Sequence, residues 1–169
     1  MTDSKERLTQ WLRDAHAMEE QAETMLSGQI ERLENYPELR DRMTLHLEET
    51  RQQAKRLEQC LDRMGEGSST LKDAGGKLIA MGQSISGLFA GDEVMKGSLA
   101  SYTFEHMEIA SYKMLIAAAG EVGDSETQSA CKANLREEEA MAEWLESKLG
   151  TVTSEFLRRE ERDSDAAKR

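Results

Sequence analysis

Four long stretches of this sequence place apolar residues three and four positions apart, and this spacing limits the fold more than any other feature. The only proline, Pro37, separates the first two stretches, and glycine-containing segments follow the second and third. Good helix formers dominate all four, and no run shows the alternation typical of a strand. The sequence therefore predicts an all-α fold, with helices over residues 4–34, 38–64, 93–119 and 125–149.

The connection between the second and third predicted helices is long, from residue 65 to residue 91. Apolar residues there suggest an interrupted helix, which four glycines weaken. Such a length is too great for a turn between antiparallel neighbours, so we expect a helical crossover that carries the chain back along a four-helix bundle. The chain length suits one domain, over residues 1–150, followed by a polar, partly helical tail over residues 151–169.

The charge balance excludes some partners. The formal net charge is −11, whereas nucleic-acid binding needs clustered Lys and Arg. No stretch reaches the roughly 18 apolar residues of a membrane span, and the N-terminus has no apolar signal region. We therefore expect a cytoplasmic protein that binds neither nucleic acid nor membranes. Cys60 and Cys131 lie in predicted helices without a metal-binding spacing, which favours two buried thiols.

Acidic residues interrupt the apolar faces of the predicted helices. Glu19, Glu105 and Glu138 lie close to the centres of three faces, and Glu108 follows Glu105 by one turn. A buried carboxylate is costly unless it is paired or holds a metal. No Lys or Arg occupies the centre of a facing stripe, so a buried salt bridge is the weaker explanation.

Carboxylates that converge from four helices repel one another unless a cation lies between them. Oxygen ligands together with an imidazole suit iron or manganese, and two such ions bridged by carboxylates can react with oxygen or peroxide. The predicted metal ligands are Glu19, His46, Glu49, Glu105, Glu108 and Glu138.

Several of these residues have a simpler interpretation. Glu49 and Glu137 lie away from the stripe centres, where a solvated position is more common. A histidine such as His46 is more often an ordinary core residue, and it gains weight only from Glu49 one turn later. His106 points about 100° away from Glu105, either towards the surface or behind the ligands. Tyr112 is either a core residue or a hydrogen-bond partner of a ligand.

The two halves of the chain repeat weakly. Glu19 precedes a Met-Leu pair by the same distance as Glu108 does, and a second match between the predicted second and fourth helices keeps nearly the same offset. Two related helical hairpins would place the acidic positions around one pseudo-twofold axis in the core.

Taken together, these motifs resemble the YciE/YciF-type ferritin-like family. The resemblance covers residues 5–150 and rests on four blocks: Glu19-Glu20-Gln21, His46-Leu47-Glu48-Glu49-Thr50 with Gln53 and Arg56-Leu57, Glu105-His106-x-Glu108-Ile109-Ala110-Ser111-Tyr112, and Leu135-Arg136-Glu137-Glu138-Glu139. It implies a ferritin-like four-helix bundle with an additional crossover helix, a homodimer, and a centre of two iron ions per chain, with manganese as the other candidate. Members of this family are associated with bacterial stress responses.

The chain differs from rubrerythrin, a more distant relative in fold that also carries Glu-x-x-Glu on its third helix. Rubrerythrin-like proteins place a histidine about one turn after a glutamate on the second and fourth helices. Here Gln52 follows Glu49, and Met141 follows Glu138. This difference keeps two hypotheses open: a metal centre with oxidase or peroxidase chemistry, and a metal-free structural or stress-associated interaction protein. The sequence assigns no catalytic residue.

Overall fold

The computed structural model describes residues 3–65 and 93–168, and all regular structure within them is helical. The helices are α1 (Ser4–Ile30), α2 (Pro37–Arg63), α5 (Glu93–Glu121), α6 (Ser125–Glu160) and α7 (Ser164–Ala167). The predicted all-α fold is therefore confirmed, whereas the predicted crossover lies outside the described residues. Within the described ranges, every helix is too short or too polar to cross a membrane.

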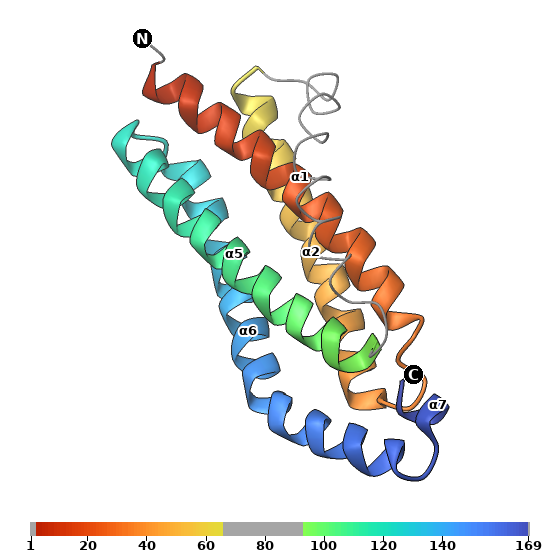
Figure 1. Cartoon of the computed structure of the whole chain (residues 1–169). Helices are drawn as coiled ribbons and strands as arrows, with labels where there is room; N and C mark the ends of the chain where they lie inside the picture. Colours follow the sequence, from red (N-terminus) through yellow and green to blue (C-terminus); the bar gives the residue numbers. More distant parts are fainter. Residues whose placement is uncertain (1–2, 66–92, 169) are drawn as a thin grey trace.

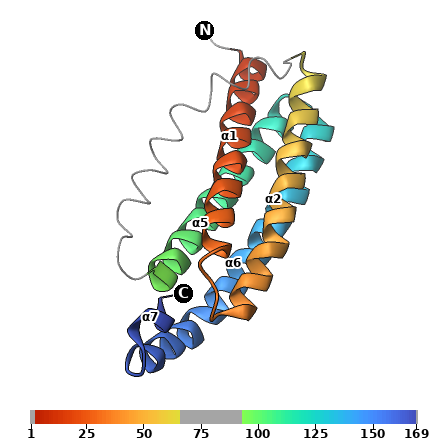
Figure 2. The same cartoon turned by 90° about the vertical axis from the view of Figure 1, so that its right-hand side faces the viewer.

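The four long helices form a bundle of two hairpins. α1 packs on α2 and α5 on α6, while α1 also lies beside α5 and α2 beside α6. In Figures 1 and 2, α1 and α6 run in one direction, and α2 and α5 run in the other. α2 ends and α5 begins at opposite ends of the bundle (Figure 1), which is the connectivity of a ferritin-like fold. The two hairpins predicted from the internal repeat are thus present.

The helix ends follow from local sequence. Pro37 occupies the first position of α2, where its missing N–H leaves no hydrogen bond unmade. Gly123 adopts a φ of 75° in the turn after α5, a conformation that a side chain would strain. Asp124 then caps α6, because its side chain accepts a hydrogen bond of 3.0 Å from the Thr127 backbone N–H. The chain therefore reverses tightly between α5 and α6.

Two apolar clusters fill the bundle, one towards each end. The first includes Leu8, Leu12, Met18, Leu57, Leu61, Phe104, Leu115 and the buried free thiols Cys60 and Cys131. The second includes Leu26, Leu33, Leu39, Met43, Leu47, Val94, Met141, Leu145 and Val152. On every long helix, buried polar residues lie among or between the members of these two clusters, close to the middle of the bundle. A polar layer therefore divides the core about halfway along the bundle.

α6 is longer than predicted. The sequence predicts that this helix ends at residue 149, and the prediction is wrong because α6 continues to Glu160. Gly150 costs the helix about 1 kcal/mol, but Val152 and Phe156 are buried beyond it. Each buried side chain of this size contributes roughly 1.5–3 kcal/mol, so burial outweighs the cost of the glycine.

The C-terminal residues return to the turn between α1 and α2. The Tyr36 hydroxyl donates a hydrogen bond of 2.8 Å to the Ala167 carbonyl, and the Asn35 amide donates one of 3.0 Å to the Ala166 carbonyl. The Arg159 guanidinium lies 4.3 Å from the centre of the Tyr36 ring. Residues beyond Gly150 thus contact the bundle through several groups at once.

Candidate metal centre

Four residues of the polar layer can meet at one ion. His46 from α2, Glu105 and Glu108 from α5, and Glu138 from α6 each offer one ligand atom, and these atoms all lie within 4.8 Å of one another. All four residues are at least 99% buried. The i, i+3 spacing puts Glu105 and Glu108 on one face of α5, so a single helix supplies two of the carboxylates.

Glu19 brings the fourth helix to this layer. It is fully buried on α1, and its Oε1 accepts a hydrogen bond from the Tyr112 hydroxyl. Its second oxygen, Oε2, has no hydrogen-bond partner in the part of the chain that the structure describes. Tyr112 therefore fulfils both of the roles considered for it, as a core residue and as the partner of a candidate ligand.

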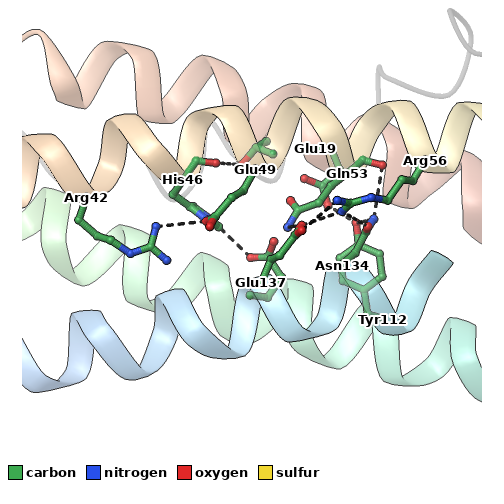
Figure 3. A network of polar contacts seen from close by, with 11 residues as sticks. Glu19, Arg42, His46, Glu49, Gln53, Arg56, Tyr112, Asn134 and Glu137 are labelled. Atoms are coloured by element: carbon green, nitrogen blue, oxygen red, sulfur yellow. Dashed lines mark hydrogen bonds and ion pairs between the residues drawn. The ribbon is translucent and has the colours of Figure 1, made fainter. Parts of the chain in front are cut away.

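The orientation of His46 is fixed by Glu49, which lies on the other side of the ring. His46 Nδ1 is 2.8 Å from Glu49 Oε2, while Nε2 is 3.1 Å from Glu105 Oε2 and 3.6 Å from Glu138 Oε2. Arg42 contacts the same Glu49 oxygen at 3.1 Å (Figure 3). Burial opposes ionisation of Glu49, yet hydrogen bonds from His46 and Arg42 lower its pKa. An ionised Glu49 accepts the Nδ1 proton and leaves Nε2 facing the other carboxylates.

Burial strongly disfavours charge in this layer. It raises the pKa of Glu105 to about 8, with His46 opposing the rise and Glu138 adding to it. Burial and the charges of Glu138 and Glu19 raise the pKa of Glu108 well above its usual range. The pKa of Glu19 is raised in the same way, by burial and then by Glu138. Without a cation, these carboxyl groups can share the buried site only by holding protons.

The pKa values of Glu138 and His46 shift in the directions that favour an ion pair between them. Burial raises the pKa of Glu138, but the neighbouring His46, Glu105 and Glu108 outweigh it and lower the pKa overall. Burial lowers the pKa of His46, but the charge of Glu105 and hydrogen bonds to the surrounding carboxylates raise it overall. One carboxylate and one imidazolium can therefore stay charged while the neighbouring acids are neutral.

The donor atoms fit a metal ion. Among the described residues, several buried oxygens make no well-aligned hydrogen bond: Glu19 Oε2, Gln53 Oε1, Glu105 Oε2, Glu108 Oε1 and both oxygens of Glu138. Such atoms are rare in folded proteins and call for an explanation such as an ion. Carboxylate oxygens combined with one imidazole nitrogen are a donor set suited to iron or manganese.

A hydrogen-bonded network adjoins the carboxylates at the end near Glu19 (Figure 3). Asn134 Nδ2 donates to the Tyr112 hydroxyl at 3.0 Å, and Asn134 Oδ1 accepts from Arg56 at 2.9 Å. Arg56 also makes two hydrogen bonds to Glu137, of 2.7 and 2.9 Å. Asn134 was not recognised in the sequence, although it lies one turn before Glu138 on a largely apolar face.

The remaining predicted positions fall outside the group of four. Glu49 lies behind His46, and Glu137 is half-buried and paired with Arg56. His106 is on the surface, with its ring 4.6 Å from that of Tyr102. The structure thus brings together His46, Glu105, Glu108 and Glu138, places Glu19 beside them, and separates Glu49 from them.

Comparison with known proteins agrees with this description. Residues 3–158 match the family described as "Domain of unknown function (DUF892)". The chain belongs to the DUF892 family. A crystal structure of a protein from Xanthomonas campestris is 40% identical, covers 94% of this chain and 99% of its own, and superposes with a TM-score of 0.80.

Two further structures share the fold. One is YcfI, "a putative structural protein" from Rhodopseudomonas palustris, with 30% identity, a TM-score of 0.69, and coverage of 85% of this chain and 93% of its own. The other is the E. coli stress protein YciF, with 24% identity, a TM-score of 0.70, and coverage of 88% of this chain and 96% of its own. The predicted relationship to YciF-type proteins is therefore supported, and the last similarity concerns the fold alone.

Proposed function

We propose that this DUF892 protein is a ferritin-like metal-binding protein with a di-iron or di-manganese centre in the bundle core. The observation that carries the proposal is the convergence of His46, Glu105, Glu108 and Glu138 within 4.8 Å. These groups are buried, and several of their oxygens make no well-aligned hydrogen bond among the described residues. Binding of divalent cations would remove both the electrostatic cost and the unmade hydrogen bonds.

The residues have distinct tasks in this proposal. Glu105, Glu108 and Glu138 supply carboxylate oxygens, and His46 supplies Nε2. Glu49, held by Arg42, accepts the Nδ1 proton, so it fixes the tautomer and orientation of the ring. When bound, iron or manganese would supply redox chemistry towards oxygen or peroxide. A role in a bacterial stress response, a cytoplasmic location and a homodimer belong to the same proposal, and YciF is itself described as a stress protein.

Metal analysis of protein purified without chelator tests the proposal. We expect bound iron or manganese, and a higher melting temperature after anaerobic addition of Fe²⁺ to stripped protein. Glu105→Ala should lose the bound metal and the rise in melting temperature. Glu139→Ala, which changes an exposed acid on α6, should keep them. Oxygen or peroxide consumption with Fe²⁺, compared between these variants, separates catalysis from binding. Absence of metal together with no thermal shift contradicts the proposal.

The alternative is a metal-free structural or stress-associated interaction protein. The description of YcfI as "a putative structural protein" favours it, as does the presence of only one histidine, His46, in the candidate centre. In that case, protons shared among the buried acids would take the place of a metal. Stripped protein would then show the same melting temperature with and without Fe²⁺ or Mn²⁺.

A further inference from the structure

Gln53 is a buried amide whose oxygen makes no hydrogen bond among the described residues. It is fully buried on α2, two turns after His46 and on the same face of the helix. Its Nε2 donates to Glu137 Oε2 at 3.1 Å, but Oε1 has no partner among the described residues. Leaving a buried acceptor unsatisfied costs about 1–3 kcal/mol, so this oxygen requires an explanation.

The surrounding charges fix which way the amide faces. Glu137 makes two hydrogen bonds to the Arg56 guanidinium, at 2.7 and 2.9 Å, and an ionised carboxylate can only accept. The Gln53 nitrogen must therefore face Glu137, which is partly exposed. A flipped amide would place the Gln53 oxygen against the Glu137 carboxylate, and both of these groups can only accept. The Gln53 oxygen is consequently turned away from Glu137 and is inaccessible to solvent.

The same network connects Gln53 with Glu19 (Figure 3). Asn134 Nδ2 contacts both the Gln53 backbone carbonyl, at 3.4 Å, and the Tyr112 hydroxyl, at 3.0 Å. Tyr112 in turn donates to Glu19 Oε1, which leaves Glu19 Oε2 as the second unpartnered oxygen at this end of the carboxylate layer. His46, the only nitrogen donor of the group of four, lies one heptad earlier on α2.

We propose that Gln53 Oε1 and Glu19 Oε2 belong to a second, all-oxygen cation position beside the one that His46 occupies. This inference rests on the proposed metal centre and goes further by making its two positions chemically unequal. An amide oxygen and carboxylates favour a hard ion such as Mn²⁺, whereas the imidazole position also suits softer divalent ions.

Charge balance supports a neutral ligand at position 53. Among the described residues, Glu19, Glu105, Glu108 and Glu138 are the four buried acids of the layer, and they carry four negative charges when ionised. Two divalent cations neutralise them, while Glu49 is balanced separately by Arg42. A fifth buried carboxylate would leave an uncompensated charge in the core. Gln53 therefore adds a ligand atom without adding charge.

Manganese binding to stripped, full-length protein tests this assignment. Wild-type protein should bind two Mn²⁺ ions per chain in equilibrium dialysis, and its EPR spectrum should show spin coupling between them. Gln53→Leu should bind one ion, with the resolved hyperfine signal of isolated Mn²⁺. Gln52→Leu, the same change at an exposed neighbour, should behave as wild type. If Gln53→Leu does not fold, Gln53→Asn, which retracts the amide by one methylene, should show the same loss.

Each other outcome overturns the inference. If Gln53→Leu or Gln53→Asn retains two spin-coupled ions, Gln53 is not a ligand. If wild-type protein binds a single uncoupled ion, the second position does not exist, and of the proposed function only metal binding at the His46 position remains. If wild-type protein binds no Mn²⁺ or Fe²⁺, both the inference and the proposed function fail.

Discussion

At the scale of single residues, the imidazole of His46 lies between carboxylates in different surroundings. Glu49 contacts Nδ1, and Glu105 contacts Nε2. The first carboxylate is partly exposed and paired with Arg42, whereas the second is buried. Spacing alone suggested that Glu49 was a ligand, because His46 and Glu49 are one turn apart. Its position behind the ring favours an orienting role instead.

Glu49→Gln tests this role. The amide keeps the size of the side chain but weakens its hold on the Nδ1 proton, so we expect metal affinity to fall about 10-fold or more. Calorimetric titration with Mn²⁺ measures the change. Glu48→Gln is the matched control, since Glu48 is exposed and pairs with Arg51 on the surface. Equal affinities for the two variants would contradict an orienting role for Glu49.

Glu108 shows what the buried acids contribute without metal. Its pKa is raised well above the usual range by burial, Glu138 and Glu19, so the metal-free fold holds it neutral at a cost. We expect Glu108→Leu to raise the free energy of unfolding of stripped protein by about 1 kcal/mol. The same variant should lose the stabilisation by Fe²⁺ that wild type shows. Urea denaturation with and without metal measures both quantities, and a less stable stripped variant would contradict the prediction.

At the scale of elements, the part of α6 beyond residue 150 contributes buried side chains that the sequence did not predict. Glycine is common just after the end of a helix, but α6 continues past Gly150 and Phe156 is buried beyond it. Phe156→Ala should therefore lower the free energy of unfolding by about 3 kcal/mol. Leu157→Ala, at a neighbouring side chain that is 54% exposed, should change it by less than about 0.5 kcal/mol. Similar effects of both changes in thermal or chemical denaturation would show that residues after 150 form only a loose tail.

At the scale of the whole molecule, the division of the core by a polar layer makes stability depend on pH. The pKa of Glu105 is raised to about 8, mainly by burial, and those of Glu19, Glu108 and His46 are also raised. A group with a raised pKa binds its proton more tightly in the folded state, so its stabilising effect is lost as pH rises towards the folded value. The lowered pKa of Glu138 has the opposite effect on stability, but only in acid. Its contribution is present at neutral pH and is lost as the pH falls below the usual pKa range of a glutamate.

Stripped protein should therefore melt at a lower temperature at pH 8.5 than at pH 6. Divalent metal replaces the shared protons, so stabilisation by Mn²⁺ should be larger at pH 8.5. Differential scanning calorimetry of stripped protein, with and without Mn²⁺ under anaerobic conditions, measures both effects. A melting temperature that rises with pH in the absence of metal would show that the buried acids are ionised in the folded state.

Much of the fold could be predicted from the sequence. Helical spacing, Pro37 and the glycines near residues 65 and 123 located the four long helices to within a few residues, apart from the end of α6. That end was misjudged because glycine preference is local, whereas the burial of Val152 and Phe156 depends on contacts far along the chain. The buried positions of Glu19, Glu105, Glu108 and Glu138 also followed from their places on apolar faces.

The sequence by itself determined that acids from several helices would enter one core, because helical periodicity fixes which side chains share a face. Only the tertiary structure decided which of them meet. It placed Glu49 behind His46, joined Tyr112 to Glu19, and left one oxygen of Gln53 without a partner among the described residues. Distances between helices depend on packing and on side-chain orientation across elements, and spacing within one helix carries no information about either.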